Sequence, residues 1–239
     1  MRSSVEERWF NMNAPLEAVV SWMYLDIRGL VTVGVGNLLP NVEYAVALPF
    51  VRKDTLEPAT EQEIRDDFAA ISGMKSLAKD GHRAAASVAK LRLTGDGMHK
   101  LVMSKFHQNA AHLKSRFRDI DEWPAAAQAA VASLAWACGP AFRFPKLEAH
   151  LRNQNFKDAV DEIHMNEYTT DPHGRPIKNG GLVPRNYMNK ALMLEAAFVK
   201  EHNLDRDELW YPMTPSLRVS ENQPIVHDMN SYFPERNKP

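Results

Sequence analysis

The chain has 239 residues, of which 44% are hydrophobic and 25% are charged. This composition supplies a sizeable apolar core and argues against an intrinsically disordered chain. The 29 Lys and Arg residues nearly balance the 30 Asp and Glu residues, so the net charge of -1 gives no general attraction to nucleic acid or other polyanions.

The single cysteine, Cys138, excludes an internal disulfide framework and a zinc site with several cysteines. No stretch has the roughly 18 uncharged apolar residues that a membrane-spanning helix needs, so we expect a soluble protein without membrane insertion. The first ten residues lack the apolar run of a secretory signal peptide, which predicts synthesis in the cytoplasm without such a signal.

The N-terminal part of the sequence predicts a helix followed by a small β-hairpin. The helix covers residues 13–23. Its apolar face, at helical spacing, consists of Leu16, Val19, Val20 and Met23. A turn over residues 26–29 leads into a strand over residues 30–36, where valines alternate with other residues. This hairpin is the only β structure that the sequence predicts.

The remaining sequence predicts mainly helices. Thr60 and Glu63 form a capping box that begins a helix ending at Gly73. Further predicted helices cover residues 82–91, 98–117, 125–138, 145–151, 156–165 and 184–198. The helix over 125–138 has Gln128 and Ser133 as its only polar side chains, which is typical of a helix in the centre of a core.

Polar and Pro-rich segments are expected at the surface. The charged run Arg65-Asp66-Asp67 predicts a solvated helix face, and the Gly- and Pro-rich residues 169–181 predict a loop. The last helix is expected to have one face formed by Tyr187, Ala191, Leu194 and Phe198. Together these elements predict an α+β fold that is mainly α.

The elements also predict a division of the chain. We expect a small lobe over residues 1–60, which carries the helix and the hairpin. A larger helical lobe would cover residues 61–202. Residues 203–239 contain five prolines, which predicts an extended C-terminal arm.

Two carboxyl residues of the predicted helix and hairpin suit glycosidic hydrolysis. Glu17 and Asp26 lie nine residues apart and Thr32 follows on the strand, so the three side chains can meet around one cleft. Hydrolysis needs one protonated carboxyl for the leaving oxygen and one ionised carboxylate to activate water. The apolar helix face favours a protonated Glu17, whereas the polar turn keeps Asp26 ionised. The alternative to a catalytic pair is two unrelated carboxylates, because a chain with 30 acidic residues contains many Glu and Asp residues at such a spacing.

The residues around this pair form a longer motif. The sequence runs Glu17-x8-Asp26-x2-Gly29-x2-Thr32-x-Gly34-x-Gly36-x-Leu38-Leu39, with Tyr24 two residues before Asp26. This run resembles the signature of the phage-type lysozymes, glycoside hydrolase family 24 of the lysozyme-like superfamily. Weaker likenesses to the same family follow in the same order, at residues 123–165 and at Gly181-Leu-Val-Pro-Arg185. The resemblance implies a lysozyme-like two-lobe fold with a small β-hairpin lobe and the substrate between the lobes.

The resemblance also implies a role for each of the three residues. Glu17 would be the general acid, Asp26 the carboxylate that orients or activates water, and Thr32 the hydroxyl that helps to place this water. The substrate would be the β-1,4 bond between N-acetylmuramic acid and N-acetylglucosamine in peptidoglycan, cleaved with inversion. No metal or other cofactor is expected.

Three further residues are predicted to contact or position the substrate. Arg185 lies in the first turn of the last helix, where a cation opposes the helix dipole and needs an anionic partner. The matching arginine of the family pairs with the catalytic glutamate; a surface arginine beside the preceding loop is the alternative. Asn37 replaces the histidine that is usual in the family and can donate a hydrogen bond. Trp22, close to the expected cleft, is a candidate for stacking on a sugar ring.

Other chemistries fit the sequence less well. His107 and His112 are five residues apart, which misses the i, i+4 spacing of two metal ligands on a helix. Cys138 lies in an apolar helix, where a thiol is expected to fill the core. The run Gly34-x-Gly36 is too short for a dinucleotide-binding loop.

The sequence therefore predicts a muramidase that binds peptidoglycan glycan strands, either as a phage endolysin or as an antibacterial secreted effector. Either protein would act in the periplasm or cell wall of a bacterium, and an effector would have a secretion apparatus and an immunity protein as further partners. A non-catalytic peptidoglycan-binding or structural module with the same fold is the main alternative, favoured by Asn37 and by the long segment 40–90. A chitinase-like hydrolase is a third candidate.

Overall fold

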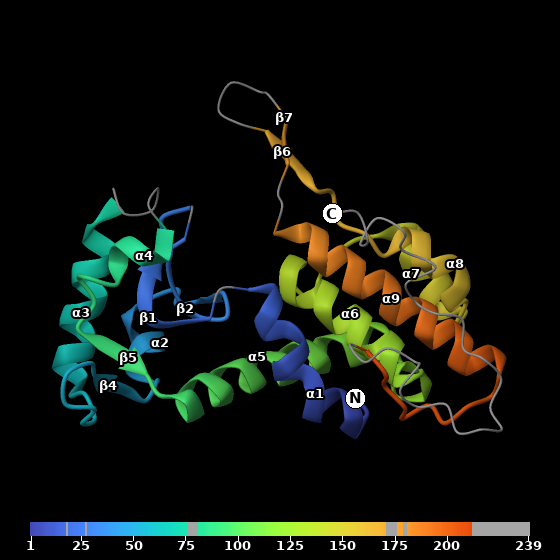
Figure 1. The fold of residues 1–239 in the computed structure, drawn as a ribbon, viewed down its shortest axis with the longest axis horizontal. Coiled ribbons are helices and arrows are strands. Elements are labelled where there is room, and N and C mark those ends of the chain that lie inside the picture. The colour runs from blue at the N-terminus through green and yellow to red at the C-terminus, as the bar shows by residue number, and fades with distance from the viewer. Residues whose placement is uncertain (18, 27, 76–80, 171–175, 179–180, 212–239) are drawn as a thin grey trace, which may run out of the picture. The chain divides into compact units, whose positions relative to one another are not determined.

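The computed structural model describes residues 1–17, 19–26, 28–75, 81–170, 176–178 and 181–211. Within these residues it contains nine α-helices and three small antiparallel sheets (Figure 1). The predicted class, α+β and mainly α, is confirmed. None of the described helices is long and apolar enough to cross a membrane.

The helices are α1 (Ser3–Asn13), α2 (Val42–Val46), α3 (Glu61–Gly73), α4 (Gly81–Ala85), α5 (Gly95–Arg116), α6 (Ala125–Cys138), α7 (Pro145–Arg152), α8 (Phe156–Glu162) and α9 (Leu182–Glu201). The strands are β1 (Val20–Leu25), β2 (Val31–Gly34), β3 (Asn37–Leu38), β4 (Phe50–Arg52), β5 (Leu91–Leu93), β6 (Tyr168–Thr170) and β7 (Pro176–Lys178). Two single turns of 3-10 helix are η1 (Ala14–Leu16) and η3 (Ile120–Glu122).

The chain forms two compact units. The sheet unit consists of residues 13–108, and the helical unit consists of residues 1–12 and 109–239. Helix α5 begins in the sheet unit and ends in the helical unit. This boundary differs from the predicted one near residue 60, because α3, α4 and β5 all pack against β1 and therefore belong with the N-terminal sheet.

The helical unit is built around α6. Every residue of α6 from Ala125 to Trp136 is buried, which confirms the prediction of a central helix. Helix α9 packs along α6 and also against α8 (Figure 1). The ring of Trp9 in α1 contacts that of Trp136, with centroids 5.7 Å apart. Cys138 was expected in the core, but it is exposed because it comes after the buried part of α6.

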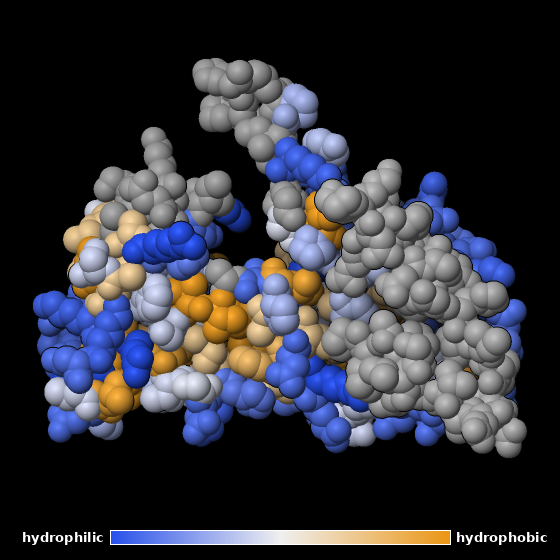
Figure 2. Space-filling view, viewed as in Figure 1, coloured by the Kyte–Doolittle hydropathy of each residue, from blue (hydrophilic) through white to orange (hydrophobic). Residues whose placement is uncertain are grey.

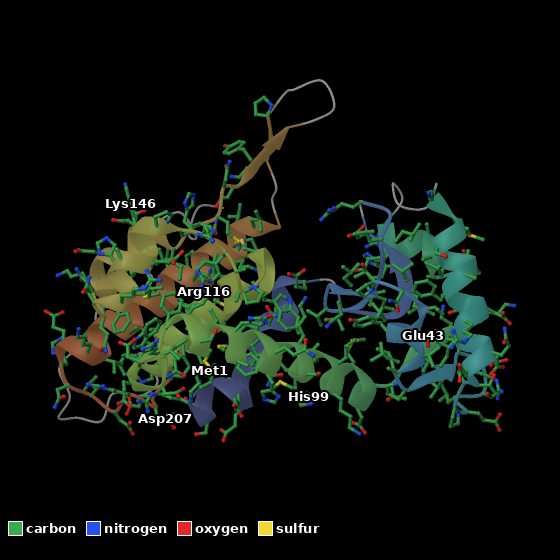
Figure 3. All side chains as sticks on the ribbon, turned by 180° about the vertical axis from the view of Figure 1, so that it is seen from behind. Met1, Glu43, His99, Arg116, Lys146 and Asp207 are labelled. Carbon is green, nitrogen blue, oxygen red and sulfur yellow. The ribbon has the colours of Figure 1, made fainter. Side chains whose placement is uncertain are left out.

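Both ends of the described chain are attached near the start of α6. The amino group of Met1, which is labelled in Figure 3, pairs with the Asp121 carboxylate at 3.1 Å. On the C-terminal side, the carbonyl oxygen of Arg206 accepts a hydrogen bond from the backbone N–H of Ala125 at 2.7 Å. The first part of the predicted arm is therefore packed on this unit, and residues 212–239 lie outside the described residues.

The sheet unit holds β1, β2 and β3 side by side in this order. Thr32 of β2 pairs with Tyr24 of β1 on one side and with Leu38 of β3 on the other. Directly paired residues of antiparallel strands carry their side chains on the same face of the sheet. Tyr24, Thr32 and Leu38 therefore form a row across one face, and the predicted strand and hairpin are confirmed.

The predicted helix over residues 13–23 is wrong. Helix α1 ends where this helix was expected to begin, η1 follows, and residues 20–25 form β1. The register between β1 and β2 shifts between Val20 and Tyr24, which marks a bulge in β1. Because of this bulge, the buried side chains of Val20 and Met23 are three residues apart, a spacing that imitates a helix face.

The prediction of a single hairpin is also wrong. Residues 50–52 pair with residues 91–93 in a second sheet, and β6 with β7 forms a third sheet inside the predicted loop over 169–181. The predicted helix over 82–91 is reduced to α4, since its last residue already belongs to β5. Pairing between distant segments does not produce a local periodic pattern in the sequence. The sequence therefore did not predict these strands.

Helix α9 buries a different face from the predicted one. Tyr187, Leu194 and Phe198 are only half-buried, although Ala191 is buried as expected. The fully covered side chains include Arg185, Met188, Leu192, Ala196 and Val199. Because α9 packs on both α6 and α8, its buried surface is wider than a single apolar stripe and includes polar residues.

The outer surface of α3 carries ion pairs. Arg65 pairs with Glu43 at 2.8 Å and with Glu61 at 2.6 Å. Figure 2 shows mainly hydrophilic residues along this edge of the sheet unit, and Figure 3 labels Glu43 there. Exposed pairs of this kind contribute little to stability, because water and salt screen them. The prediction of a solvated face is thus correct for this part of α3.

Asp67 departs from that prediction. Its side chain lies on the inner side of α3 and the residue is only 3% exposed. The carboxylate accepts hydrogen bonds from the backbone N–H groups of Lys90 at 2.8 Å and Leu91 at 3.3 Å. Burial raises the pKa of Asp67, while these two bonds act in the opposite direction. Asp67 thereby joins α3 to the start of β5.

Asp67→Ala should lower the free energy of unfolding by about 1–3 kcal/mol, because two backbone N–H groups lose their buried acceptor. Urea unfolding would measure this change. Asp66→Ala is the matched control: Asp66 is exposed on the same helix, and its replacement should change the stability by less than about 0.5 kcal/mol. Equal effects of the two substitutions would contradict the role given to Asp67.

Candidate active site

Glu17 lies between η1 and β1. Its backbone is extended, with φ -131° and ψ 155°, and its N–H donates to the carbonyl oxygen of Ala14 at 3.3 Å. The half-buried side chain reaches the turn between β2 and β3, where Oε2 would lie 3.7 Å from a Cβ atom added to Gly36. Gly36 has φ +68°, so a glycine suits both the turn and the space beside this carboxyl.

Asp26 is fixed by the turn that follows β1. Its Oδ1 atom accepts hydrogen bonds from the backbone N–H groups of Arg28 and Leu30, both at 2.9 Å. The backbone N–H of Gly29 donates to the carbonyl oxygen of Asp26 at 2.8 Å, which confirms the predicted turn. The direction of this carboxyl group is therefore set by the backbone of the turn.

Tyr24 connects the two carboxyl residues. Burial of the phenol, followed by the negative charges of Glu17 and Asp26, raises the pKa of Tyr24 to about 12. The charges of both carboxylates therefore contribute to the electrostatic potential at the Tyr24 hydroxyl, after the larger effect of burial. From the sequence, Tyr24 was visible only as part of the longer motif, although a spacing of two residues on a strand places it on the same face as Asp26.

Thr32 lies beside Tyr24 on β2, and it is 4% exposed. Its hydroxyl donates a hydrogen bond to the carbonyl oxygen of Leu30 at 3.1 Å. A hydroxyl that donates in this way keeps lone pairs that can accept a hydrogen bond from water. The contribution that Thr32 can make to placing a water molecule is therefore that of an acceptor.

The indole of Trp22 is held by contacts within the sheet unit. Its N–H donates to the backbone carbonyl oxygen of His82 at 2.9 Å. The ammonium of Lys53 lies 5.1 Å from the centre of the indole ring, which is a cation–π contact. One ring face is thereby occupied, so at most the other face of Trp22 is left for the predicted stacking on a sugar.

Asn37 belongs to the turn between β2 and β3. Its Oδ1 atom accepts from the backbone N–H of Val35 at 3.2 Å, and the residue is 4% exposed. The same oxygen would lie 3.0 Å from a Cβ atom on Gly34, so only a glycine leaves room for it there. The Asn37 amide oxygen therefore closes the turn, and a hydrogen bond from its amide nitrogen to substrate stays a prediction.

Arg185 belongs to the helical unit and is 1% exposed. Its guanidinium donates to the Ser133 hydroxyl at 3.0 Å and to the Ser133 carbonyl oxygen at 3.4 Å. This burial contradicts the alternative of a surface arginine near the preceding loop. The pairing of Arg185 with Glu17 stays a prediction.

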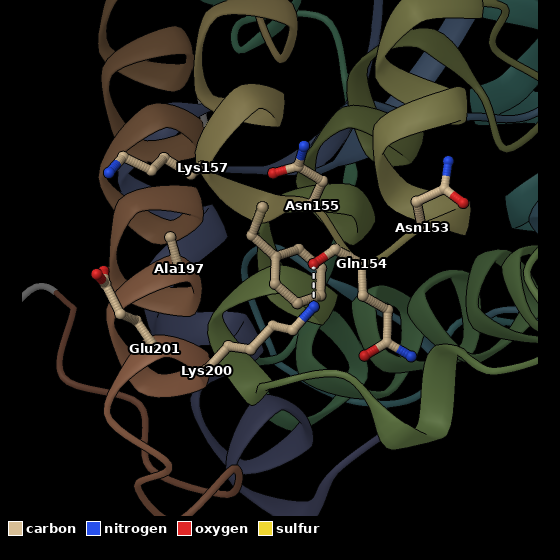
Figure 4. Close-up of a pocket in the computed structure, with 8 residues that line it drawn as sticks. Asn153, Gln154, Asn155, Lys157, Ala197, Lys200 and Glu201 are labelled. Carbon is tan, nitrogen blue, oxygen red and sulfur yellow. Dashed lines mark hydrogen bonds between the residues drawn. The ribbon is translucent and has the colours of Figure 1, made fainter.

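Two pockets lie away from these residues. In the helical unit, a pocket of about 530 Å³ lies between the residues that follow α7 and the last turns of α9 (Figure 4). Lys200 borders it and donates to the carbonyl oxygen of Gln154 at 2.7 Å. In the sheet unit, a pocket of about 590 Å³ is lined by charged residues of both signs, among them Lys53 and Asp67. No predicted site residue lines either pocket.

The candidate active site therefore consists of four residues of the sheet unit: Glu17, Tyr24, Asp26 and Thr32. In the part of the chain that the structure describes, no group of three His, Cys, Asp or Glu side chains is placed to hold a metal ion. Comparison with models of known protein families gives no match for this chain, and comparison with curated protein sequences gives none either. The chemistry must accordingly be argued from the residues themselves.

Glu17→Gln and Asp26→Asn should each lower the pKa of Tyr24 from about 12 toward its ordinary value of 10, because each removes a negative charge near the hydroxyl. The absorbance of tyrosinate would follow this titration, and Tyr24→Phe in each background identifies the contribution of this residue. Glu43→Gln, at an exposed position of the same unit, should leave the titration unchanged. If neither variant shifted it, the two carboxylates would not share the Tyr24 hydroxyl.

Proposed function

We propose that this protein is a peptidoglycan hydrolase of the muramidase class, which cleaves the β-1,4 bond between N-acetylmuramic acid and N-acetylglucosamine. One observation carries the proposal: a single hairpin brings together the Glu17 carboxyl at the turn between β2 and β3, the Asp26 carboxyl in the turn after β1, and Thr32 on β2. The arrangement supports two-carboxylate chemistry, and the resemblance of the motif to the phage-type lysozymes supplies the substrate class.

In the proposed reaction, Glu17 donates its proton to the glycosidic oxygen, so that the leaving sugar departs as an alcohol. Asp26 accepts a proton from a water molecule on the opposite face of the sugar ring, and the oxygen of this water bonds to the anomeric carbon. Attack from the opposite face inverts the configuration at this carbon. Thr32 accepts a hydrogen bond from the same water, since its own hydrogen is directed to the Leu30 carbonyl.

The local structure supports these roles. The half-buried Glu17 carboxyl lies at the turn between β2 and β3, where Gly36 presents no side chain. Two backbone N–H groups fix Asp26 through one oxygen, Oδ1. Because its pKa is raised to about 12, Tyr24 keeps its proton at neutral pH and is a neutral hydrogen-bond donor beside two acids.

A non-catalytic peptidoglycan-binding or structural module is the second candidate. The burial of Asn37 in its own turn favours it, because a buried side chain at the position of the usual histidine of the family is less accessible to substrate. Such a module would bind peptidoglycan saturably and release no new reducing ends. A chitinase-like hydrolase would release them from chitin instead.

As a muramidase, the protein would act in the periplasm or cell wall of a bacterium, as a phage endolysin or as an antibacterial effector. An effector would be accompanied by an immunity protein and a secretion apparatus. Both settings use the same glycan strands and the same two carboxyl groups, so one test of the reaction serves for both.

Glu17→Gln should lower the rate of glycosidic cleavage by at least about 100-fold, because the amide has no acidic proton to transfer. The release of reducing ends from purified peptidoglycan measures the rate, and mass spectrometry of the released sugars identifies the bond. Glu43→Gln serves as the control, since Glu43 is an exposed glutamate of the same unit. Cleavage by Glu17→Gln at the wild-type rate would exclude the mechanism.

Asp26→Asn should lose most of the activity and keep its fold, because the amide oxygen can still accept from the N–H groups of Arg28 and Leu30. Thr32→Ala should also lose activity, while the lost bond to Leu30 costs about 1 kcal/mol of stability. Thermal unfolding and cleavage rates, measured on the same samples, separate the two effects. A loss of activity that merely follows the loss of folded protein would assign both residues a structural role.

A further inference from the structure

Helix α4 packs against β1 beside the candidate active site, and two hydrogen bonds fix its position (Figure 1). The indole N–H of Trp22 donates to the carbonyl oxygen of His82 at 2.9 Å, near the start of α4. The ammonium of Lys53 donates to the carbonyl oxygen of Ala86 at 2.9 Å, just after the end of α4. Both ends of this short helix are therefore attached, and the His82 side chain has a defined place.

The imidazole of His82 contacts the ring of Tyr24. The two ring centroids are 6.1 Å apart and the ring planes make an angle of 74°, which is an edge-to-face arrangement. Aromatic rings prefer this arrangement, because the positive edge of one ring meets the negative face of the other. Tyr24 thus contacts α4 through its ring, while its hydroxyl lies in the field of the Glu17 and Asp26 carboxylates.

The position of a tyrosine hydroxyl depends on how its ring is held. The hydroxyl is at the far end of the side chain, so a small tilt of the ring changes the distance from this oxygen to both carboxylates. A neighbouring ring that packs against the phenol limits this tilt and also excludes water from it. In the sheet unit, the half-buried His82 is placed to do both for Tyr24.

We propose that His82 is a positioning residue for Tyr24: its ring packs against the phenol and thereby fixes the direction of the Tyr24 hydroxyl on the face of the hairpin that also holds Thr32. The effect of His82 on a reaction rate rests on the proposed glycosidic hydrolysis. Its effect on Tyr24 does not, because the contact between the two rings exists whatever the reaction is.

The proposal requires the ring of His82 and not its proton. The backbone carbonyl of His82 binds Trp22, and this bond is unaffected by a change of side chain. A phenyl ring at position 82 has an edge of similar size and no titratable nitrogen. Packing therefore predicts that His82→Phe behaves like the wild type, whereas proton transfer by the imidazole predicts that it behaves like His82→Ala.

The first experiment is a tyrosinate titration of the full chain, with Tyr24→Phe in each background to isolate Tyr24. In His82→Ala, the pKa of Tyr24 should fall from about 12 toward 10, because burial is the main cause of its elevation and the shielding ring is lost. In His82→Phe it should remain near 12. His112→Ala, an exposed histidine of α5, is the control and should leave the titration unchanged.

The second experiment measures cleavage of soluble peptidoglycan fragments by the same variants. His82→Ala should lower kcat about tenfold with KM changed less than about twofold, because a displaced hydroxyl disturbs the catalytic geometry more than the binding of substrate. His82→Phe should restore kcat. If the wild-type chain cleaves no peptidoglycan, the proposed hydrolysis fails, and the titration still decides whether His82 positions Tyr24.

Two results would overturn the proposal: an unchanged Tyr24 titration in His82→Ala, or a loss in His82→Phe equal to that in His82→Ala. If His82→Ala does not fold, Trp22→Phe provides an independent test. This variant removes the bond that attaches α4 near its start but keeps the imidazole. It should shift the Tyr24 titration in the same direction by a smaller amount, and the absence of any shift would count against the proposal.

Discussion

The bend in β1 is the constraint on which the candidate active site depends. Glu17 and Asp26 are nine residues apart, and a fully extended chain of that length would separate them by about 30 Å. The charges of the two carboxylates nevertheless both contribute to the electrostatic potential at the Tyr24 hydroxyl. The register of β1 shifts between Val20 and Tyr24, which marks a bulge. A bulge bends its strand and can redirect a side chain, and bulges are over-represented beside active sites. The pairing of Tyr24 with Thr32 then adds the hydroxyl of β2 to the same group.

The parts of the fold that could be predicted are those whose cause lies within a few neighbouring residues. The capping box of Thr60 and Glu63 and the apolar helix α6 are of this kind, and the structure contains both. The strand β1 was mistaken for a helix because its bulge spaces the buried residues by three. Residues 50–52 find their partners only at residues 91–93, and Asp67 binds backbone N–H groups of the same distant segment. No local pattern contains such information.

The candidate site, like the fold, has parts that could be predicted from neighbouring residues and parts that could not. Glu17, Asp26 and Thr32 could be identified because they are close in the sequence: Glu17 precedes β1, Asp26 follows it, and Thr32 lies on β2. The hydrogen-bond partners of the individual side chains could not be identified from the sequence. The Asn37 amide closes its own turn, and the Trp22 indole binds a carbonyl sixty residues later in the chain. The ring contact of His82 in α4 with Tyr24 could not be predicted either, because the two residues are far apart in the sequence. The segment 40–90 therefore contributes directly to the surroundings of Tyr24, through α4.

The order of the two units along the chain has a consequence for biosynthesis. Helix α1 precedes the sheet unit in the chain, yet it belongs to the helical unit, whose central helix begins only at Ala125. The whole sheet unit, residues 13–108, lies between them as one continuous stretch and leaves the ribosome earlier. Since domains generally fold as units as they emerge, the two acids can reach their final arrangement while α1 still has no core to join. The sheet unit, with the candidate active site, can thus be complete before α1 has its partners in the helical unit.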